Sequence, residues 1–175
     1  MAVREAAIAL LLDEGLGGFT LDKVSKRAEV NRTTLYRRWG SRERLLTWAL
    51  LEHQRVTIPQ PDTGSLDKDL VALALSLGQE VAGPLGAMFA TLFADHRARD
   101  PEIDAALKDF WTERDRLAGE ILQRGIDRGD IGENVDGGLL LEMLFGTVYF
   151  RILRGGKAPS REAVERLVAH VLAQH

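Results

Sequence analysis

Apolar residues recur every three or four positions along most of the chain, which is the spacing of one face of an α-helix. Capping and breaking residues, chiefly Gly, Pro, Ser, Thr, Asn and Asp, divide the pattern into segments of helical length. Ser65 and Asp136 are expected to cap two of the later helices, and Pro159-Ser160 opens the last one. No stretch alternates with a period of two over the length of a strand, so the sequence predicts an all-α protein. The expected helices cover residues 3–13, 21–28, 32–39, 42–56, 66–81, 84–97, 101–127, 139–153 and 160–173.

Two short expected helices follow one another closely between Thr20 and Trp39. Thr20 is a good N-cap for the first, and Asn31 for the second, because a side-chain oxygen can accept an unpaired amide of the first turn. Leu35 and Trp39 place one face of the second helix inward. Its outer face then holds Arg32, Thr33, Tyr36 and Arg37. Two short helices joined by a three-residue turn, with the second polar and basic outside, are typical of the helix-turn-helix that binds the DNA major groove.

The segment 58–64 (I-P-Q-P-D-T-G) combines proline, glycine and polar residues and stops the preceding helix. We place a domain boundary there, which gives a DNA-binding domain over 1–56 and a helical domain over 57–175. The first domain holds ten Lys and Arg against seven Asp and Glu, a net of +3, so the remainder contributes −6 to the total of −3. A basic patch on an acidic body is expected of a protein that meets phosphate at one end only.

Composition excludes several other classes of protein. There is no cysteine, so disulfides and thiolate metal sites are not available, and a cytoplasmic location is expected. The apolar runs are too short or too interrupted to span a bilayer, and no signal peptide is expected at the N-terminus. The four histidines lack metal-binding spacing, and neither Gly-x-Ser-x-Gly nor a phosphate-binding glycine loop occurs. We therefore expect no metal, no cofactor, no membrane partner and no enzymatic activity.

The first fifty residues resemble the DNA-binding region of the TetR (tetracycline-repressor) family of bacterial transcription regulators. The resemblance rests on A-A-I-A-L-L-L-D-E-G (6–15), F-T-L-D-K-V-S-K-R-A-E-V (19–30) and N-R-T-T-L-Y-R-R-W-G-S-R-E-R-L-L (31–46). In the second half, R-G-D-I (128–131), V-D (135–136) and F-G-T-V-Y-F-R-I-L-R-G-G-K-A-P (145–159) also resemble regulatory domains of this family. Two features depart from it: Glu29 stands where the turn usually has glycine, and the first helix begins almost at Met1, where the family often has a basic arm.

The resemblance implies a ligand-responsive regulator, most often a repressor, that binds a palindromic operator as a homodimer and is released by a small molecule. Carried over by position, the DNA-binding residues are Thr20, Arg32, Thr33, Thr34, Tyr36, Arg37 and Arg42. Base reading would fall to some of Arg32, Thr33 and Arg37, because arginine can bond guanine and the threonine methyl can contact thymine. Thr20, Thr34, Tyr36 and Arg42 would bind phosphate, which fixes register without specifying sequence. The alternative is a basic surface that contacts only water.

Large apolar side chains of the second half form a candidate pocket for the small molecule. Its expected members are Met88, Phe89, Phe93, His96, Trp111, Phe145 and Tyr149. The alternative for each of them is ordinary core, and nothing in the sequence names a ligand. The last two helices, within 136–154 and 160–173, are apolar over wide faces that can pack inward or against a second copy. The resemblance favours a dimer interface there, which also places two recognition helices one turn of DNA apart.

Two other readings remain open at this stage. The first is a helical small-molecule-binding protein without DNA-binding activity, and the second is a helical enzyme.

Overall fold

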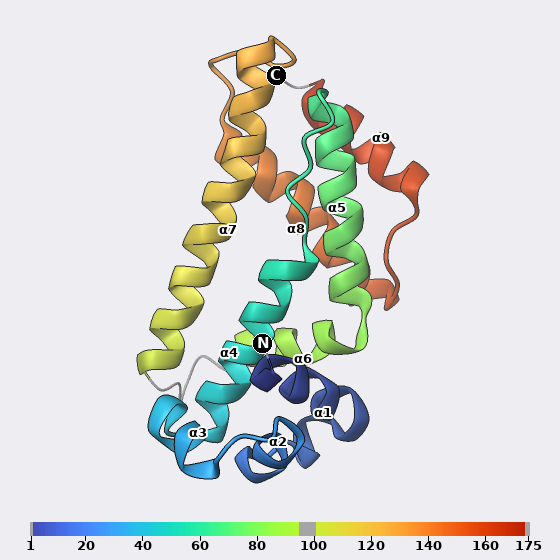
Figure 1. Cartoon of the computed structure of the whole chain (residues 1–175). Coiled ribbons are helices and arrows are strands. Elements are labelled where there is room, and N and C mark those ends of the chain that lie inside the picture. Colours follow the sequence, from blue (N-terminus) through green and yellow to red (C-terminus); the bar gives the residue numbers. More distant parts are fainter. Residues whose placement is uncertain (1, 95–100, 174–175) are drawn as a thin grey trace. The chain divides into compact units, whose positions relative to one another are not determined.

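The computed structural model describes residues 2–94 and 101–173, and in this part of the chain the only regular secondary structure is α-helix (Figure 1), which confirms the all-α prediction. The helices are α1 (Ala2–Gly18), α2 (Leu21–Arg27), α3 (Arg32–Trp39), α4 (Arg42–Thr57), α5 (Leu66–Ala82), α6 (Pro84–Ala94), α7 (Pro101–Arg128), α8 (Gly137–Gly155) and α9 (Arg161–Leu172). Inside α1, Gly15 leaves the helical conformation with φ 66°, at the position where the sequence predicts the helix to end. The end expected for α6, at residue 97, lies outside the described residues.

The chain forms two compact units, which we call the head unit (Met1–Val56 and Pro84–Phe110) and the body unit (Thr57–Gly83 and Trp111–His175). The first boundary coincides with the one that the sequence predicts after residue 56. The segment Pro84–Phe110 differs from that prediction, because it belongs to the head unit rather than to the body. The physical reason is burial: its apolar side chains share one core with those of α1 to α4. The residues that α6 and α7 contribute to this core are Leu85, Phe89, Ile103, Leu107 and Phe110.

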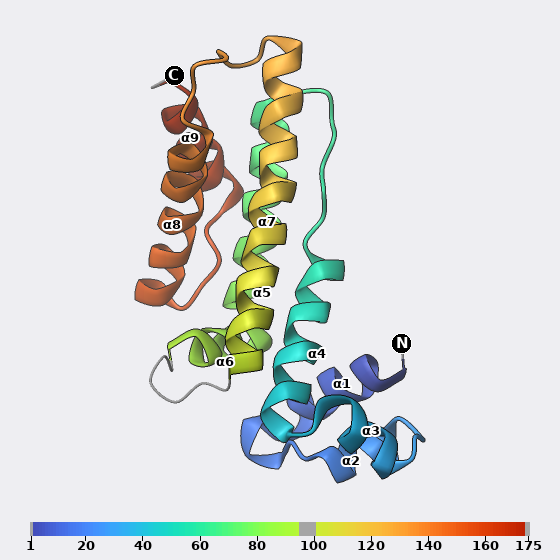
Figure 2. The ribbon, with the colours of Figure 1, turned by 90° about the vertical axis from the view of Figure 1, so that its left-hand side faces the viewer.

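Helices α5, α8, α9 and the later part of α7 build the body unit around a second core. In Figure 2 these four helices alternate in direction along the chain. Helix α9 packs against both α5 and α8. The sequence leaves open whether the apolar faces of α8 and α9 pack inward, and for part of each face they do. The residues of these two helices that are buried in the core are Leu140, Leu144, Val148, Ile152, Val164, Val168 and Val171.

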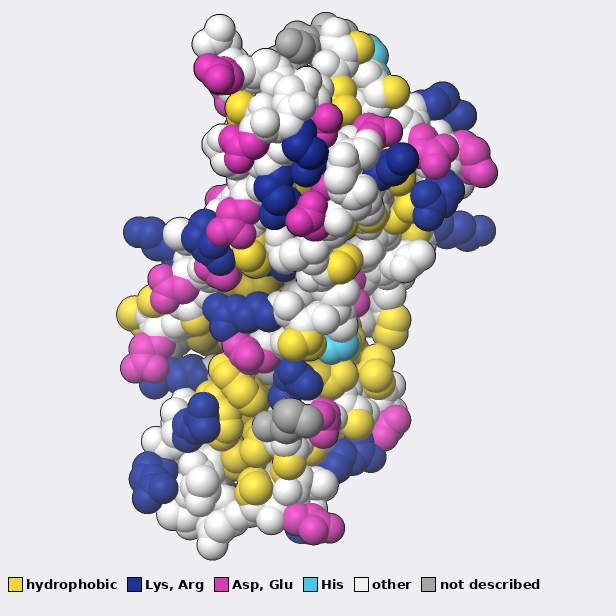
Figure 3. All heavy atoms as spheres, turned by 45° about the horizontal axis from the view of Figure 1, so that its top comes forward, with side chains coloured by type: hydrophobic (Ala, Val, Ile, Leu, Met, Phe, Trp, Pro, Cys, Tyr) yellow, Lys and Arg dark blue, Asp and Glu magenta, His cyan; other side chains and the backbone are white. Residues whose placement is uncertain are grey.

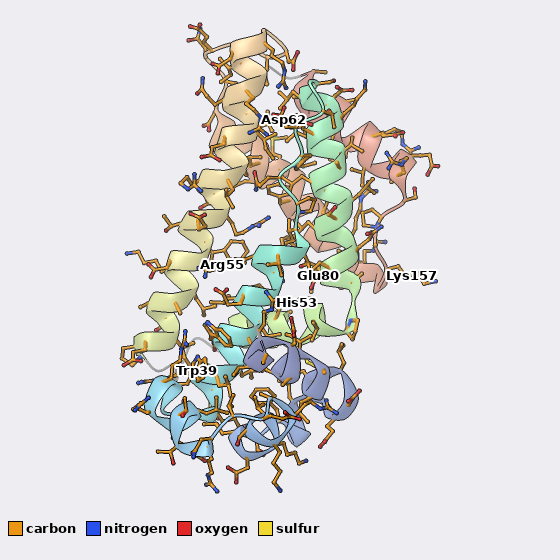
Figure 4. The ribbon with its side chains drawn as sticks, in the orientation of Figure 1. Trp39, His53, Arg55, Asp62, Glu80 and Lys157 are labelled. Atoms are coloured by element: carbon orange, nitrogen blue, oxygen red, sulfur yellow. The ribbon has the colours of Figure 1, made fainter. Side chains whose placement is uncertain are left out.

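Polar contacts hold the linker between α4 and α5 against the end of α7. The Arg124 guanidinium donates to the Pro61 carbonyl at 2.7 Å, and it also lies 3.6 Å from the carboxylate of Asp62, which Figure 4 labels. The fully buried Asp69 accepts from the Thr63 amide at 2.7 Å, and Asp130 accepts from the Leu66 amide at 3.0 Å. The segment rich in proline and glycine is therefore anchored within the body unit rather than loosely attached.

Acidic and basic side chains are interspersed on the face drawn in Figure 3, rather than separated into regions of one sign. No single helix among the described residues is both long and apolar enough to cross a membrane. Helix α5 and Pro84–Ala90 of α6 meet that criterion only when they are counted together.

Candidate nucleic-acid interface and ligand cavity

The turn between α2 and α3 is held by hydrogen bonds from both sides. The Ser25 hydroxyl donates to the Val30 carbonyl at 2.8 Å, and the Val30 amide donates to the Ser25 carbonyl at 3.1 Å. Glu29 adopts φ 54°, a left-handed conformation that glycine adopts at lower cost. The turn therefore forms with glutamate where the resembled family usually has glycine.

Both caps of the two short helices are present as expected. The Thr20 side chain accepts from the Lys23 amide at 3.3 Å, and the Asn31 side chain accepts from the Thr33 amide at 2.8 Å. In α3, Leu35 and Trp39 are buried in the core of the head unit, and Figure 4 labels Trp39 there. The residues of α3 that remain exposed are Arg32, Thr33, Thr34, Tyr36, Arg37 and Arg38. The recognition helix thus presents a polar surface with three arginines on one element.

Arg32 is oriented by two neighbours. Its Nε lies 2.8 Å from the Asp22 carboxylate of α2, its Nη2 donates to the Tyr36 hydroxyl at 3.3 Å, and its guanidinium lies 5.0 Å from the centre of the Tyr36 ring. Arg37 is exposed and forms no ion pair with any residue that the structure describes. Of the two arginines expected to read bases, Arg37 is therefore the one that is free to turn toward a partner.

Two other arginines have contacts that the sequence does not indicate. Arg42, expected at phosphate, donates from Nε to the Phe19 carbonyl at 2.8 Å and from Nη2 to the Leu16 carbonyl. Its guanidinium therefore ties the start of α4 to the end of α1, and its phosphate contact stays a prediction. Arg38 lies over the rings of Trp39 and Trp48, at 4.9 and 5.9 Å from their centres.

The body unit contains a cavity of about 710 Å³, within the range of sites for small molecules. Apolar side chains from α5, α7 and α8 form most of its wall, and Gln60, Arg114, Asp115, Gln123 and Glu142 supply polar groups. Burial raises the pKa of Tyr149 to about 12, against a smaller opposite effect of the Arg114 charge, so its hydroxyl stays protonated at neutral pH.

Three of the seven expected pocket residues, Trp111, Phe145 and Tyr149, line this cavity together. Met88 and Phe89 do not, because Phe89 is buried in the core of the head unit and Met88 packs against that core. The side chain of Phe93 and all of His96 lie outside the described residues. Sequence reasoning missed Arg114, although a signal was present: Trp111, Arg114 and Ala118 recur at i, i+3 and i+7, which is one helix face.

One face of α8 leaves large apolar side chains exposed. We call it the α8 stripe; its members are Leu139, Met143, Phe150 and Leu153, with 48, 38, 62 and 76% of their surfaces exposed. Their spacing of 4, 7 and 3 residues keeps them on one side of the helix. A row of exposed large apolar side chains on one helix face is typical of an interaction site.

These features define a DNA-binding protein of the helix-turn-helix class with a helical body. The sequence model of the bacterial regulatory proteins of the tetR family matches residues 3–47, and that of the tetracyclin repressor-like C-terminal domain matches residues 60–171. The chain belongs to the TetR family of bacterial transcriptional regulators, and it is a DNA-binding transcriptional regulator.

Curated relatives resemble the chain over most of its length. The HTH-type transcriptional regulator AqdR of Rhodococcus erythropolis is 34% identical over 88% of this chain and 74% of its own. The DNA-binding transcriptional repressor TetR of Mycobacteroides abscessus is 31% identical over 98% of this chain and 90% of its own.

Among solved structures, the TetR family transcription regulator SCO0332 has a TM-score of 0.82 at 27% identity, covering 99% of this chain and 96% of its own. FadR from Bacillus subtilis, solved in complex with stearoyl-CoA, has a TM-score of 0.69 at 19% identity, covering 100% and 98%. At 19% identity, the similarity to FadR shows a shared fold.

Proposed function

We propose that this protein is a homodimeric, ligand-responsive repressor that acts in the cytoplasm and binds a palindromic operator. The observation on which the proposal rests is the surface of α3, whose exposed threonines and arginines stand on a helix that is capped by Asn31 and preceded by a hydrogen-bonded turn. One helix of eight residues reads only a few base pairs, so specific binding requires two copies related by a two-fold axis. A relative over nearly the whole chain is named a repressor, which supports that direction of regulation.

For the second copy, the α8 stripe is the surface that we assign to the dimer interface. The stripe lies on α8, and the sequence favours α8 and α9 together as the dimer interface. Pairing two copies across it would remove from water four exposed apolar side chains of the body unit.

The cavity of the body unit is the proposed effector site. Its occupant would bias the long helices and α4 toward a geometry in which the two recognition helices no longer match the operator. This is a population shift, so the ligand must bind the released geometry more tightly than the DNA-binding one. Helix α7 supplies residues both to the cavity wall and to the head core. A ligand-induced change at the cavity could therefore be passed to the head unit along one helix.

Operator binding is the test of this function. Selection from random duplex oligonucleotides would give a bound sequence, and fluorescence anisotropy would then measure its affinity across a salt series. We expect saturation at two subunits per site, steep weakening with salt, and an affinity about ten- to a hundredfold lower for Arg37→Ala. Arg116→Ala, at an exposed arginine of α7 in the body unit, is the matched control and should bind as the wild type does.

Equal binding by Arg37→Ala and the wild type would contradict the assignment of α3. A selection that enriches no sequence at all would instead favour the alternative, a helical small-molecule-binding protein without DNA-binding activity.

A further inference from the structure

We infer that the effector cavity takes an amphipathic carboxylate: an apolar molecule whose single anionic group binds the guanidinium of Arg114. The inference deepens the proposed function, since it rests on the cavity being an effector site. It is drawn from the kinds of side chain that line the cavity and from how deeply each charged group lies.

The apolar part of such a ligand matches most of the cavity wall. Leu73 and Leu77 of α5 face the cavity from one side, and Trp111 and Leu122 of α7 and Phe145 of α8 complete it. Filling this space with hydrocarbon removes apolar surface of both partners from water. A small polar molecule would gain little from these walls.

The charged side chains of the cavity determine which polar group the ligand carries at its other end. Arg114 is half-buried, and its guanidinium forms no hydrogen bond or salt bridge with any described residue. Desolvation lowers its pKa from the ordinary value, because burial disfavours the charged form, and the nearby Tyr149 and Glu113 oppose this effect only in part. A carboxylate on Arg114 would give its guanidinium a hydrogen-bonded ion-pair partner, and arginine binds planar carboxylates in a bidentate geometry. The protonated hydroxyl of Tyr149, close enough to influence the same guanidinium, is available as a further donor.

The acidic residues of the cavity limit the charge of the ligand. Asp115 and Glu142 also line it, but both are exposed, so water screens them more strongly than it screens Arg114. With one half-buried cation against two exposed carboxylates, a polyanion such as a polyphosphate is disfavoured. A cationic ligand would leave the Arg114 guanidinium without an ion-pair partner. One anionic group on an apolar body satisfies both constraints.

A matched set of three probes tests this inference: decanoate, decan-1-ol and decylamine, titrated into the full chain by calorimetry. We expect decanoate to bind the wild type about ten- to a hundredfold more tightly than the alcohol or the amine, the gain of a charge-assisted hydrogen bond. Arg114→Met should remove that preference while leaving the affinity for decan-1-ol unchanged, which also shows that the variant is folded. Arg114→Lys should keep part of the preference.

Arg116→Met is the control, because Arg116 lies on the same helix but is exposed and paired with Glu113 and Glu120. A wild type without preference for decanoate, or without affinity for any probe, would overturn the inference, as would a preference that survives in Arg114→Met. Operator anisotropy with each probe separates this result from the proposed function. An Arg114-dependent preference without operator release would keep the inference and reject the ligand response. Operator binding by a protein that does not bind decanoate would reject the inference and keep the DNA-binding part of the proposed function.

Discussion

At the scale of single residues, Glu29 is the only non-glycine residue with positive φ in the described part of the chain. A side chain with a Cβ pays about 1–2 kcal/mol for the left-handed conformation, and glycine does not. Glycine loses more freedom on folding, which offsets about half of that gain. We therefore expect Glu29→Gly to raise the free energy of unfolding by roughly 0.5–1 kcal/mol, measured by urea denaturation.

Glu29→Ala is the control for this prediction, since it removes the carboxylate but keeps the Cβ. It should be less stable than Glu29→Gly. Equal stability of the two variants would mean that the charge, and not the backbone conformation, sets the cost.

Tyr149 predicts a loss of stability in alkali. Its pKa is raised from 10.0 to about 12 in the folded protein, mainly by burial. Above pH 10 the unfolded chain releases this proton while the folded protein holds it, so the unfolded state gains stability between pH 10 and 12. At pH 11.5, about 1.5 units above the ordinary pKa, the loss should approach about 2 kcal/mol, given about 1.36 kcal/mol for each pKa unit. Urea denaturation at pH 8 and pH 11.5 should show this loss in the wild type beyond any loss in Tyr149→Phe. Parallel losses in the two proteins would assign the effect to other groups.

At the scale of elements, two glycines of α7 have opposite surroundings. A Cβ built on Gly125 would lie 2.8 Å from a methyl carbon of the buried Leu66, whereas one built on Gly119 would meet nothing within 4 Å. We expect Gly125→Ala to destabilise the protein by about 1–3 kcal/mol, since the close-packed neighbour has to move.

Gly119→Ala is the matched substitution on the same helix. It should stabilise the protein by up to about 1 kcal/mol, because alanine is the better helix former and its methyl group finds open space. Thermal unfolding would compare the two variants with the wild type. An increase in Tm for both would show that the contact between α5 and α7 at Gly125 is looser than the structure indicates.

The sequence predicts features that depend on near neighbours. Thr20, Asn31, Asp136 and Ser160 each accept an amide of the helix that they precede, as capping chemistry requires. Ser65 is the exception. Its hydroxyl donates to the Asp67 carboxylate, which lowers the pKa of Asp67, and it caps no amide of α5. Asp67, two positions further along, competes with the amides of α5 for the Ser65 hydroxyl. The capping pattern in the sequence does not take this competition into account.

Features that depend on distant parts of the chain were not predictable in the same way. Phe89 and Phe145 are equally apolar and both lie on helices, yet one is buried in the head core and the other lines the body cavity. Arg42 satisfies the signal for a phosphate contact, but carbonyls of Leu16 and Phe19, more than twenty positions away, accept from it. Periodicity gives the inward face of a helix and does not identify the element that this face meets.

At the scale of the whole molecule, the two units divide the proposed work. The head unit fixes α3 by a core that includes Pro84–Phe110, so part of the second half of the sequence serves DNA binding. The body unit contains both the cavity and the α8 stripe, and α8 contributes residues to each. Because one helix contributes to both surfaces, a ligand in the cavity and a second copy at the stripe would act on the same element, and in the proposed function this coupling would link ligand binding to the geometry of the dimer.

The α8 stripe gives the last prediction. Introducing charge at its most exposed positions, as Phe150→Glu with Leu153→Glu, should abolish dimerisation, because the carboxylates would be buried against a second apolar surface. Size-exclusion chromatography with light scattering should report 19.4 kDa for this variant and twice that mass for the wild type. Operator affinity should fall as well, although α3 is unchanged, because one head contacts only one half-site. Leu12→Glu, at a leucine of α1 that is 50% exposed, should remain dimeric. A double variant that still elutes as a dimer would remove the stripe from the interface and leave α9 as the surface to test.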